Sequence, residues 1–284
     1  MQDHNSIYRL CLLGKNIKSS LSPLIHDSSA HFLGKRCKYD IVELENENDF
    51  NNFLQHFWDH NGYGLNITTP FKEFFNSQKE QSKNHLSSIN TLVRANQNWK
   101  GFSTDGPGFK RGLQQDGYKL EHFSHFIILG NGGVVPSLLK TIETSCTDPH
   151  VFILRRNKDK DKKIQNKSLI KKLSFQSFKK EDLQKITQTC PQNTLMIQAT
   201  NAPTLGENFS SSFCLSGDKF KGVFIDLLYN HFSNLYFFYK EKGTKALTGL
   251  PMLIEQARLS QEIWWGESAP YDYIRESILA TQQK

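Results

Sequence analysis

The sequence predicts an α/β protein in which two modules follow one another along the chain. The length of 284 residues exceeds the usual size of a single domain. Short apolar runs alternate with segments of helical periodicity, an order that is typical of parallel strands joined by helical crossovers. The alternation starts again near residue 125, so we expect a second sheet there.

The first module begins with a strand expected at residues 8–14, an apolar run that ends at a glycine. Further strands are expected at residues 37–44 and 62–68, and apolar side chains recur at helical spacing in residues 21–34 and 49–60. The order strand, helix, strand, helix, strand indicates parallel pairing through right-handed crossovers.

The second module repeats this order with shorter and more apolar strands. They are expected at residues 126–129, 150–154, 194–200 and 222–229. A helix is expected at residues 134–145, directly after the first of these strands. Two further helices are expected at residues 250–265 and 271–283, and their local pattern is compatible with packing on either module.

Composition excludes several classes of protein. Hydrophobic residues make up 37% of the chain, which argues for a folded protein rather than a disordered one. The five cysteines are scattered and form no C-x-x-C pair, so neither a disulfide framework nor a metal site is expected. No apolar run reaches about 18 residues, and the first residues lack the order of a signal peptide. We therefore expect a soluble, cytoplasmic protein without a membrane partner.

The net charge of +7 has two interpretations. A basic protein can bind nucleic acid, but much of the excess lies in residues 155–173, and no aromatic and basic RNA-binding motif accompanies it. The favoured interpretation of this run is a solvated helix and loop. No nucleic-acid partner is therefore expected.

A glycine turn separates the first strand of the second module from the helix that follows. Gly130, Gly132 and Gly133 stand there. Residues without a Cβ let backbone N–H groups approach a phosphate, and the start of a helix offers further donors. The dinucleotide-binding pattern G-x-G-x-x-G is incomplete, because Pro136 fills its last position. A Rossmann-like phosphate cradle and an ordinary tight turn both remain open for this segment.

Two arginines end the next strand. Arg155 and Arg156 lie about 25 residues beyond Gly130, and no carboxylate follows until Asp159. At this place in dinucleotide-binding folds an acidic residue selects NAD, whereas a basic residue pairs with the 2′-phosphate of NADP. The hypothesis is that the cofactor is NADP. The alternative is that the two arginines simply open the basic surface run.

Several polar side chains of the first module stand at expected strand ends or helix starts, where open α/β sheets bind ligands. They are Ser20, Ser22, Asn66, Thr68, Lys72, Asn90 and Asp105. Each has a structural explanation as well, such as a helix cap for Ser22 or a turn for Asn90. Together they suit a small polyhydroxylated acid, with Lys72 and Asp105 as a pair for proton transfer.

These segments carry a resemblance to a known family. The chain is similar to the shikimate dehydrogenase family over nearly its whole length, with seven of its motifs in the family's order. They are SLSPLIH, NITTPFK, SINTL, STDGPGF, GNGG, DLLY and GLPMLIEQA. The resemblance implies reversible reduction of 3-dehydroshikimate to shikimate with NADPH, in the pathway to aromatic amino acids.

The family fold implies how the chain is organised. An N-terminal α/β substrate-binding and catalytic domain would cover residues 1–104, and a Rossmann-like NADP-binding domain would cover residues 105–246. The C-terminal helices, residues 247–284, would return to the first domain. The partner would be a small-molecule substrate, and the protein would be a monomer or a homodimer.

The resemblance also assigns roles to residues. Lys72 and Asp105 would form the catalytic pair, in which Lys72 protonates the oxygen of the substrate carbonyl. Substrate-binding residues would be Ser20, Ser22, Thr68, Asn90, Asp105, Tyr229 and Gln256. Cofactor-binding residues would be Gly130, Asn131, Gly132, Gly133, Val134, Arg155, Arg156, Leu227 and Gly249. No metal ligand is implied.

Some positions depart from the family pattern. The stretch between Lys72 and Asn90 is shorter than usual, His231 stands for a proline, and Gln198 stands for the first residue of an N-A-T-P motif. The usual N-R-T after the second strand of the cofactor domain begins here with Arg155. Two alternatives stay open: a quinate/shikimate dehydrogenase that uses NAD(P), and a binding homologue without turnover.

Overall fold

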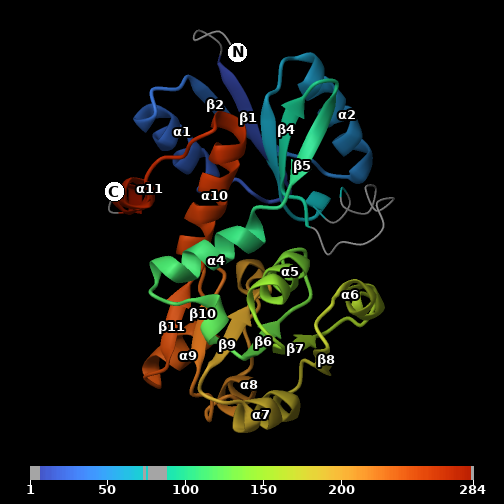
Figure 1. The fold of residues 1–284 in the computed structure, drawn as a ribbon, viewed down its shortest axis with the longest axis vertical. Helices are drawn as coiled ribbons and strands as arrows, with labels where there is room; N and C mark the ends of the chain where they lie inside the picture. The colour runs from blue at the N-terminus through green and yellow to red at the C-terminus, as the bar shows by residue number, and fades with distance from the viewer. Residues whose placement is uncertain (1–6, 73–74, 76–87, 283–284) are drawn as a thin grey trace. The chain divides into compact units, whose positions relative to one another are not determined.

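The computed structural model describes residues 7–72, 75 and 88–282, and these divide into two units (Figure 1). Unit 1 comprises the described residues up to Gly108 together with those from Ile254 onward, and unit 2 runs from Phe109 to Leu253. The expectation about the first residues of the chain lies outside the described residues, as does most of the shortened stretch after Lys72. Each unit contains a sheet flanked by helices, which confirms the predicted α/β class.

The sheet of unit 1 has the strand order β2-β1-β3-β4-β5. Strands β1 (Tyr8–Gly14), β2 (Cys37–Glu43) and β3 (Gly64–Ile67) pair in parallel, as the sequence predicts. Strands β4 (Thr91–Ala95) and β5 (Asn98–Phe102) add an antiparallel hairpin that the sequence analysis did not anticipate. The sheet is therefore mixed.

The sequence of the hairpin turn explains why β4 and β5 are not predicted from the sequence. No glycine or proline marks the turn, and Asn96 takes its left-handed position with a φ of 51°. Asparagine tolerates this conformation better than most residues. The turn signal therefore rests on one asparagine in a polar segment.

Helices cover both faces of this sheet because successive side chains of a strand point to opposite faces. Leu10 and Leu12 of β1 pack in one apolar cluster, and Cys11 and Leu13 pack in another on the opposite face. The first cluster includes side chains of α1 (Ser22–Phe32) and α10 (Leu250–Trp265), and the second includes side chains of α2 (Glu47–Asp59). Helix α11 (Tyr271–Gln282) completes unit 1 and contacts α1.

The sheet of unit 2 is wholly parallel, with the strand order β11-β10-β9-β6-β7-β8. Its strands are β6 (His125–Leu129), β7 (His150–Arg155), β8 (Lys172–Ser177), β9 (Thr194–Gln198), β10 (Val223–Asp226) and β11 (Lys245–Thr248). Counted from β6, this is the order of the dinucleotide-binding fold, and it reverses between β6 and β9. The switch point, where such sheets bind ligands, therefore lies at the glycine turn after β6.

The central strands β6, β9 and β10 of the second sheet are buried on both faces, which is why they are almost continuously apolar. On one face Ile128 and Ile153 pack with α5 (Val135–Ser145) and α6 (Asp161–Lys167). On the other, Leu129 packs with three helices. These are α7 (Lys180–Thr189), α8 (Ser211–Ser216) and α9 (Asn234–Glu241). Burying each such aliphatic side chain contributes about 1.5–3 kcal/mol.

Among the described residues no helix is both long enough and apolar enough to cross a membrane. Apolar side chains of the helices pack instead against the sheets within the two units, where they contribute to four clusters of buried side chains.

Gly64 provides a test of packing in unit 1. A Cβ at this position would lie 2.3 Å from Trp264 Nε1 and 2.9 Å from the Leu92 carbonyl oxygen. The same indole N–H donates to the Leu92 oxygen at 2.9 Å, so it has little freedom to move. We expect Gly64→Ala to lower the free energy of unfolding by about 1–3 kcal/mol in a urea titration. Gly132→Ala, where a Cβ meets nothing within 4 Å, is the matched control, and equal losses in both variants would contradict this packing.

Candidate active site

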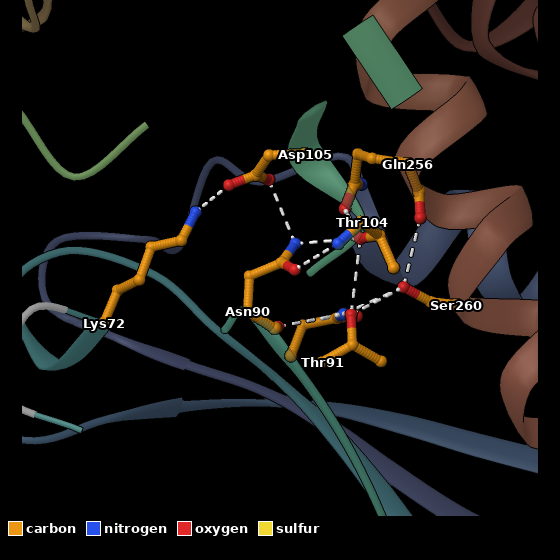
Figure 2. Close-up of polar contacts among 8 residues, drawn as sticks. Lys72, Asn90, Thr91, Thr104, Asp105, Gln256 and Ser260 are labelled. Atoms are coloured by element: carbon orange, nitrogen blue, oxygen red, sulfur yellow. Dashed lines mark hydrogen bonds and ion pairs between the residues drawn. The ribbon is translucent and has the colours of Figure 1, made fainter. Parts of the chain in front are cut away.

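A buried ion pair joins Lys72 to Asp105 in unit 1 (Figure 2). The Lys72 ammonium donates to Asp105 Oδ2, and each residue is only 8% exposed. Removing one partner of such a pair leaves an uncompensated charge away from water, so the two groups hold one another in place. The predicted proton-transfer pair is thus brought together, although the two residues lie 33 positions apart in the chain.

Local structure aims Lys72 at this partner. The strand β3 ends at Ile67, and the Lys72 backbone N–H donates to the Thr68 carbonyl oxygen at 3.0 Å. This closes one helical turn over Pro70, and the Thr69–Pro70 peptide bond is cis. The neighbouring Phe71 is 1% exposed and packs in the apolar cluster beneath the sheet. With Phe71 anchored in that cluster, the turn holds Lys72 beside Asp105 as Figure 2 shows.

Asn90 fixes the other half of the pair. Its amide nitrogen donates to Asp105 Oδ1 at 3.0 Å and to Thr104 Oγ1 at 2.9 Å, and its amide oxygen accepts from the Thr104 backbone N–H at 2.7 Å. Asp105 is also the first residue of α4 (Asp105–Gln115), where free N–H groups favour a carboxylate. One oxygen of Asp105 therefore meets the amide and the other meets the ammonium.

A second layer of buried polar groups supports Asn90. Asn66 donates to Thr91 Oγ1 at 3.0 Å and to Ser260 Oγ at 3.1 Å, and it accepts from the Tyr39 hydroxyl at 2.8 Å. No motif of the sequence points to Thr91, Ser260 or Tyr39. The available signal was Asn66 itself, because an amide inside an apolar strand needs partners for all its donors and acceptors.

The serine motif and Gln256 also lie in unit 1. Ser20 Oγ donates to Ser22 Oγ at 3.1 Å and accepts the Ser22 backbone N–H at 3.2 Å. The residue that caps α1 is Leu21, without a side-chain hydrogen bond, so Ser22 does not serve as the cap. On α10, Gln256 Oε1 accepts from Thr104 Oγ1 at 3.5 Å. Thr68, at the end of β3, is partly exposed.

The residues assigned to the cofactor all lie in unit 2, next to the carboxyl ends of its strands. The parallel register aligns these ends, since Leu129 pairs with Leu154 and with Gln198, and Gln198 pairs in turn with Asp226. Side chains and turns that are far apart in sequence therefore meet at one edge of the sheet. The assigned residues Gly130 to Val134, Arg155, Arg156, Leu227 and Gly249 begin at or just beyond this edge, and Tyr229 follows Leu227.

The glycine turn has the backbone that a phosphate cradle needs. Gly130 has a φ of 112°, and a Cβ there would lie 2.9 Å from Thr200 Cγ2, so only glycine fits. A Cβ on Gly132 would meet nothing within 4 Å, which leaves its backbone open to a close approach. Asn131 ties the turn to the next strand by donating to the Asn157 carbonyl oxygen at 2.8 Å.

Gly249 and Leu227, at the carboxyl ends of β11 and β10, are closely packed against one another. A Cβ on Gly249 would lie 2.0 Å from the Leu227 carbonyl oxygen, so these two assigned residues are brought together. Asp226 holds the loop that follows β10, because it accepts from the backbone N–H groups of Leu228 at 3.1 Å and Ser233 at 2.8 Å. Burial raises the pKa of Asp226 above the usual range for an aspartate.

The structure separates the two arginines. Arg155 is 7% exposed, and its guanidinium donates to Asp161 and to the Gln176 carbonyl oxygen. Arg156 is exposed instead and pairs with Glu207 at 3.0 Å. Only Arg156 therefore presents its guanidinium at the surface. The basic run that follows contains α6 and the start of β8, where the sequence analysis expected a helix and loop.

Within the described ranges, no group of three or more histidine, cysteine, aspartate or glutamate side chains is arranged to hold a metal ion. Apart from the Asp105 carboxylate, the polar groups that hydrogen-bond one another near Lys72 are hydroxyls and amides.

His26 of the serine motif predicts a pH dependence of stability. Its ring is fully buried against Tyr39, with ring centroids 4.4 Å apart, and burial lowers the pKa of His26 to about 3. The unfolded chain binds a proton near the ordinary pKa of about 6.5, so between these values the unfolded state holds more protons. The free energy of unfolding should therefore fall as the pH falls through this window, by up to about 1.4 kcal/mol per pH unit.

Urea titrations between about pH 6 and pH 4 measure this slope. We expect His26→Gln to have the shallower slope, and His31→Gln, an exposed position on the same helix, to behave as the wild type does. If His26→Gln has the same dependence of the unfolding free energy on pH as the wild type, other groups cause the loss of stability at low pH.

The sequence is similar to known proteins over nearly its whole length. A model of the shikimate dehydrogenase substrate binding domain matches residues 12–92, and a model of the shikimate 5′-dehydrogenase C-terminal domain matches residues 249–279. The NADP(+) shikimate dehydrogenase of Pyrococcus furiosus is 26% identical over 275 residues, 95% of this chain and 94% of the relative.

Solved structures share the fold. The shikimate dehydrogenase of Aquifex aeolicus has a TM-score of 0.81 at 24% identity, covering 98% of this chain and 99% of that one. The shikimate 5-dehydrogenase of Thermus thermophilus, in complex with NADP(H) and shikimate, has a TM-score of 0.78 at 22% identity, covering 95% and 98%. The resemblance indicated by the sequence motifs is confirmed: the chain is similar to shikimate dehydrogenases over nearly its whole length, and models of their substrate binding and C-terminal domains match two of its segments.

Proposed function

We propose that this protein is an NADP-dependent shikimate dehydrogenase that reversibly reduces 3-dehydroshikimate to shikimate. The observation that carries the proposal is the buried ion pair of Lys72 and Asp105, with Asn90 holding the second carboxylate oxygen. The name of the Pyrococcus furiosus relative and the complex of the Thermus thermophilus structure support the substrate and the cofactor. The protein would act in the cytoplasm, on the route to chorismate and the aromatic amino acids.

Unit 1 would bind the substrate. The paired hydroxyls of Ser20 and Ser22 can donate to a carboxylate. Amide and hydroxyl groups of Thr68, Asn90 and Gln256 can meet ring hydroxyls. Most of these groups are tied by hydrogen bonds to neighbouring residues, so little conformational freedom is lost when a substrate binds.

Unit 2 would bind NADP, and its residues fit that group. The open backbone at Gly132 and the start of α5 suit the pyrophosphate, and the exposed guanidinium of Arg156 suits the 2′-phosphate. Arg155 would hold the segment after β7 rather than touch the phosphate, because its guanidinium is buried and donates to Asp161 and to the Gln176 carbonyl oxygen. Leu227 and Gly249, packed against one another, would border the nicotinamide.

The residues of unit 1 would move the proton of the reaction. When bound, NADPH supplies a hydride to the C3 carbonyl carbon of 3-dehydroshikimate. As negative charge grows on the carbonyl oxygen, the Lys72 ammonium donates a hydrogen bond to it and then a proton, which yields the alcohol. Asp105 orients the ammonium and stabilises its charged form, and the neutral amine left behind regains a proton from solvent.

The overall reaction can be tested with the purified protein. Shikimate and NADP⁺ should give NADPH, whose absorbance measures the rate. Quinate in place of shikimate, and NAD⁺ in place of NADP⁺, are assayed separately as the alternative substrates. Turnover with shikimate at a kcat/KM well above that with quinate supports the proposal. Comparable turnover of quinate indicates the broader quinate/shikimate enzyme, and binding without turnover of any pair indicates a homologue that has lost catalysis.

Lys72→Ala tests the proton donor. Loss of a general acid typically lowers the rate by about 10²–10⁴-fold, so kcat should fall by this amount while the KM for shikimate changes little. Lys38→Ala is the control, because Lys38 is 64% exposed and pairs with Asp40 on β2. Circular dichroism checks that the variant is folded. If Lys72→Ala kept most of the wild-type kcat, Lys72 would not be the proton donor.

A further inference from the structure

The arginine expected to recognise the 2′-phosphate is already paired with a carboxylate of the same unit. Both terminal nitrogens of Arg156 donate to a single oxygen of Glu207, each at 3.0 Å. The two side chains are 67% and 52% exposed, so the pair lies at the surface, at the carboxyl edge of the sheet. A carboxylate oxygen is held here by two guanidinium N–H groups, as a phosphate oxygen would be.

Local structure places Glu207 at this position. The 3-10 helix η2 (Ala202–Leu205) follows β9 and ends at Gly206, which has a φ of 77°. The Glu207 backbone N–H donates to the Ala202 carbonyl oxygen at 2.9 Å, so the residue is fixed relative to η2. At the start of the same loop, Gln198 holds Thr200 by accepting its backbone N–H at 2.6 Å. The loop is one of the segments in which the sequence departs from the family pattern.

We propose that Glu207 is a specificity-determining residue that competes with the 2′-phosphate of NADP for Arg156. This inference rests on the proposed function and goes beyond it. In the chain without cofactor, Glu207 neutralises Arg156. A bound 2′-phosphate must take over the guanidinium, and it meets the negative charge of the displaced carboxylate nearby.

The two cofactors differ in their response to this carboxylate. NADP carries a phosphate at the 2′-position and is repelled, whereas NAD carries a hydroxyl there, which can donate to a carboxylate. Glu207 therefore narrows the preference for NADP over NAD without removing it. The exposed position limits the size of the effect, because exposed ion pairs contribute at most about 1 kcal/mol and are screened by salt.

Calorimetric binding of two adenine nucleotides tests the proposal without the need for turnover. Adenosine 2′,5′-bisphosphate carries the 2′-phosphate, and 5′-AMP lacks it. In Glu207→Gln, adenosine 2′,5′-bisphosphate should bind about two- to fivefold more tightly than to the wild type at low salt. The affinity for 5′-AMP should not increase, and the gain for the bisphosphate should shrink at high salt. In the enzyme assay, the ratio of kcat/KM for NADPH to that for NADH should rise by the same factor.

Two further variants separate the proposed pairing from a general charge effect. Asp148→Asn removes a carboxylate of equal exposure, 52%, that pairs with Lys172 near the amino ends of β7 and β8, and it should leave both affinities unchanged. In the Arg156→Ala background, Glu207→Gln should tighten binding of the bisphosphate less than it does in the wild type, because the competition for the guanidinium is gone and only the repulsion between carboxylate and phosphate is removed. The proposal is overturned by an unchanged affinity in Glu207→Gln, by an equal gain for 5′-AMP, or by a gain of the same size in the Arg156→Ala background. Absence of dehydrogenase turnover would reject the proposed function alone, since the binding data would still decide the role of Glu207.

Discussion

The buried ion pair of Lys72 and Asp105 is the interaction on which the site in unit 1 depends. Each charge is stable there only because the other is present and because Asn90 donates to the remaining carboxylate oxygen. A lone ammonium at 8% exposure would be costly to bury. The same requirement that stabilises the pair also pre-organises it, so an ammonium is already positioned and oriented before any substrate binds.

This pair rests on a framework that extends well beyond it. Asn66 connects β3 to β4 and to α10 through side-chain hydrogen bonds, and the indole of Trp264 fastens α10 to the Leu92 backbone. Because every member is buried, the network has one satisfied arrangement and many unsatisfied ones. That uniqueness gives α10, from the end of the chain, a fixed place beside strands from its beginning.

Unit 2 depends on a different constraint, the common register of its parallel strands. Alignment of the carboxyl ends collects the glycine turn, Arg156, Leu227 and Gly249 at one edge of the sheet. The chemical property of each residue can be read from its own type: glycine allows a close approach of the backbone, and arginine carries a positive charge. Their proximity, by contrast, results from the alignment of the strands in the sheet. Glu207 reaches the same edge by way of η2, and it brings a negative charge to a place where the sequence pattern shows only positive charge.

The sequence by itself determined the α/β class, the three parallel strands of the first module, and the motifs that carry the family resemblance. These features are local: strand and helix periods, a glycine turn, and runs such as NITTPFK can be read without knowing what lies opposite. Only the tertiary structure decided which polar groups meet. It paired Arg155 with Asp161, Arg156 with Glu207, and Asn66 with Thr91 and Ser260, because each of these contacts depends on side chains brought together by strand register and helix packing.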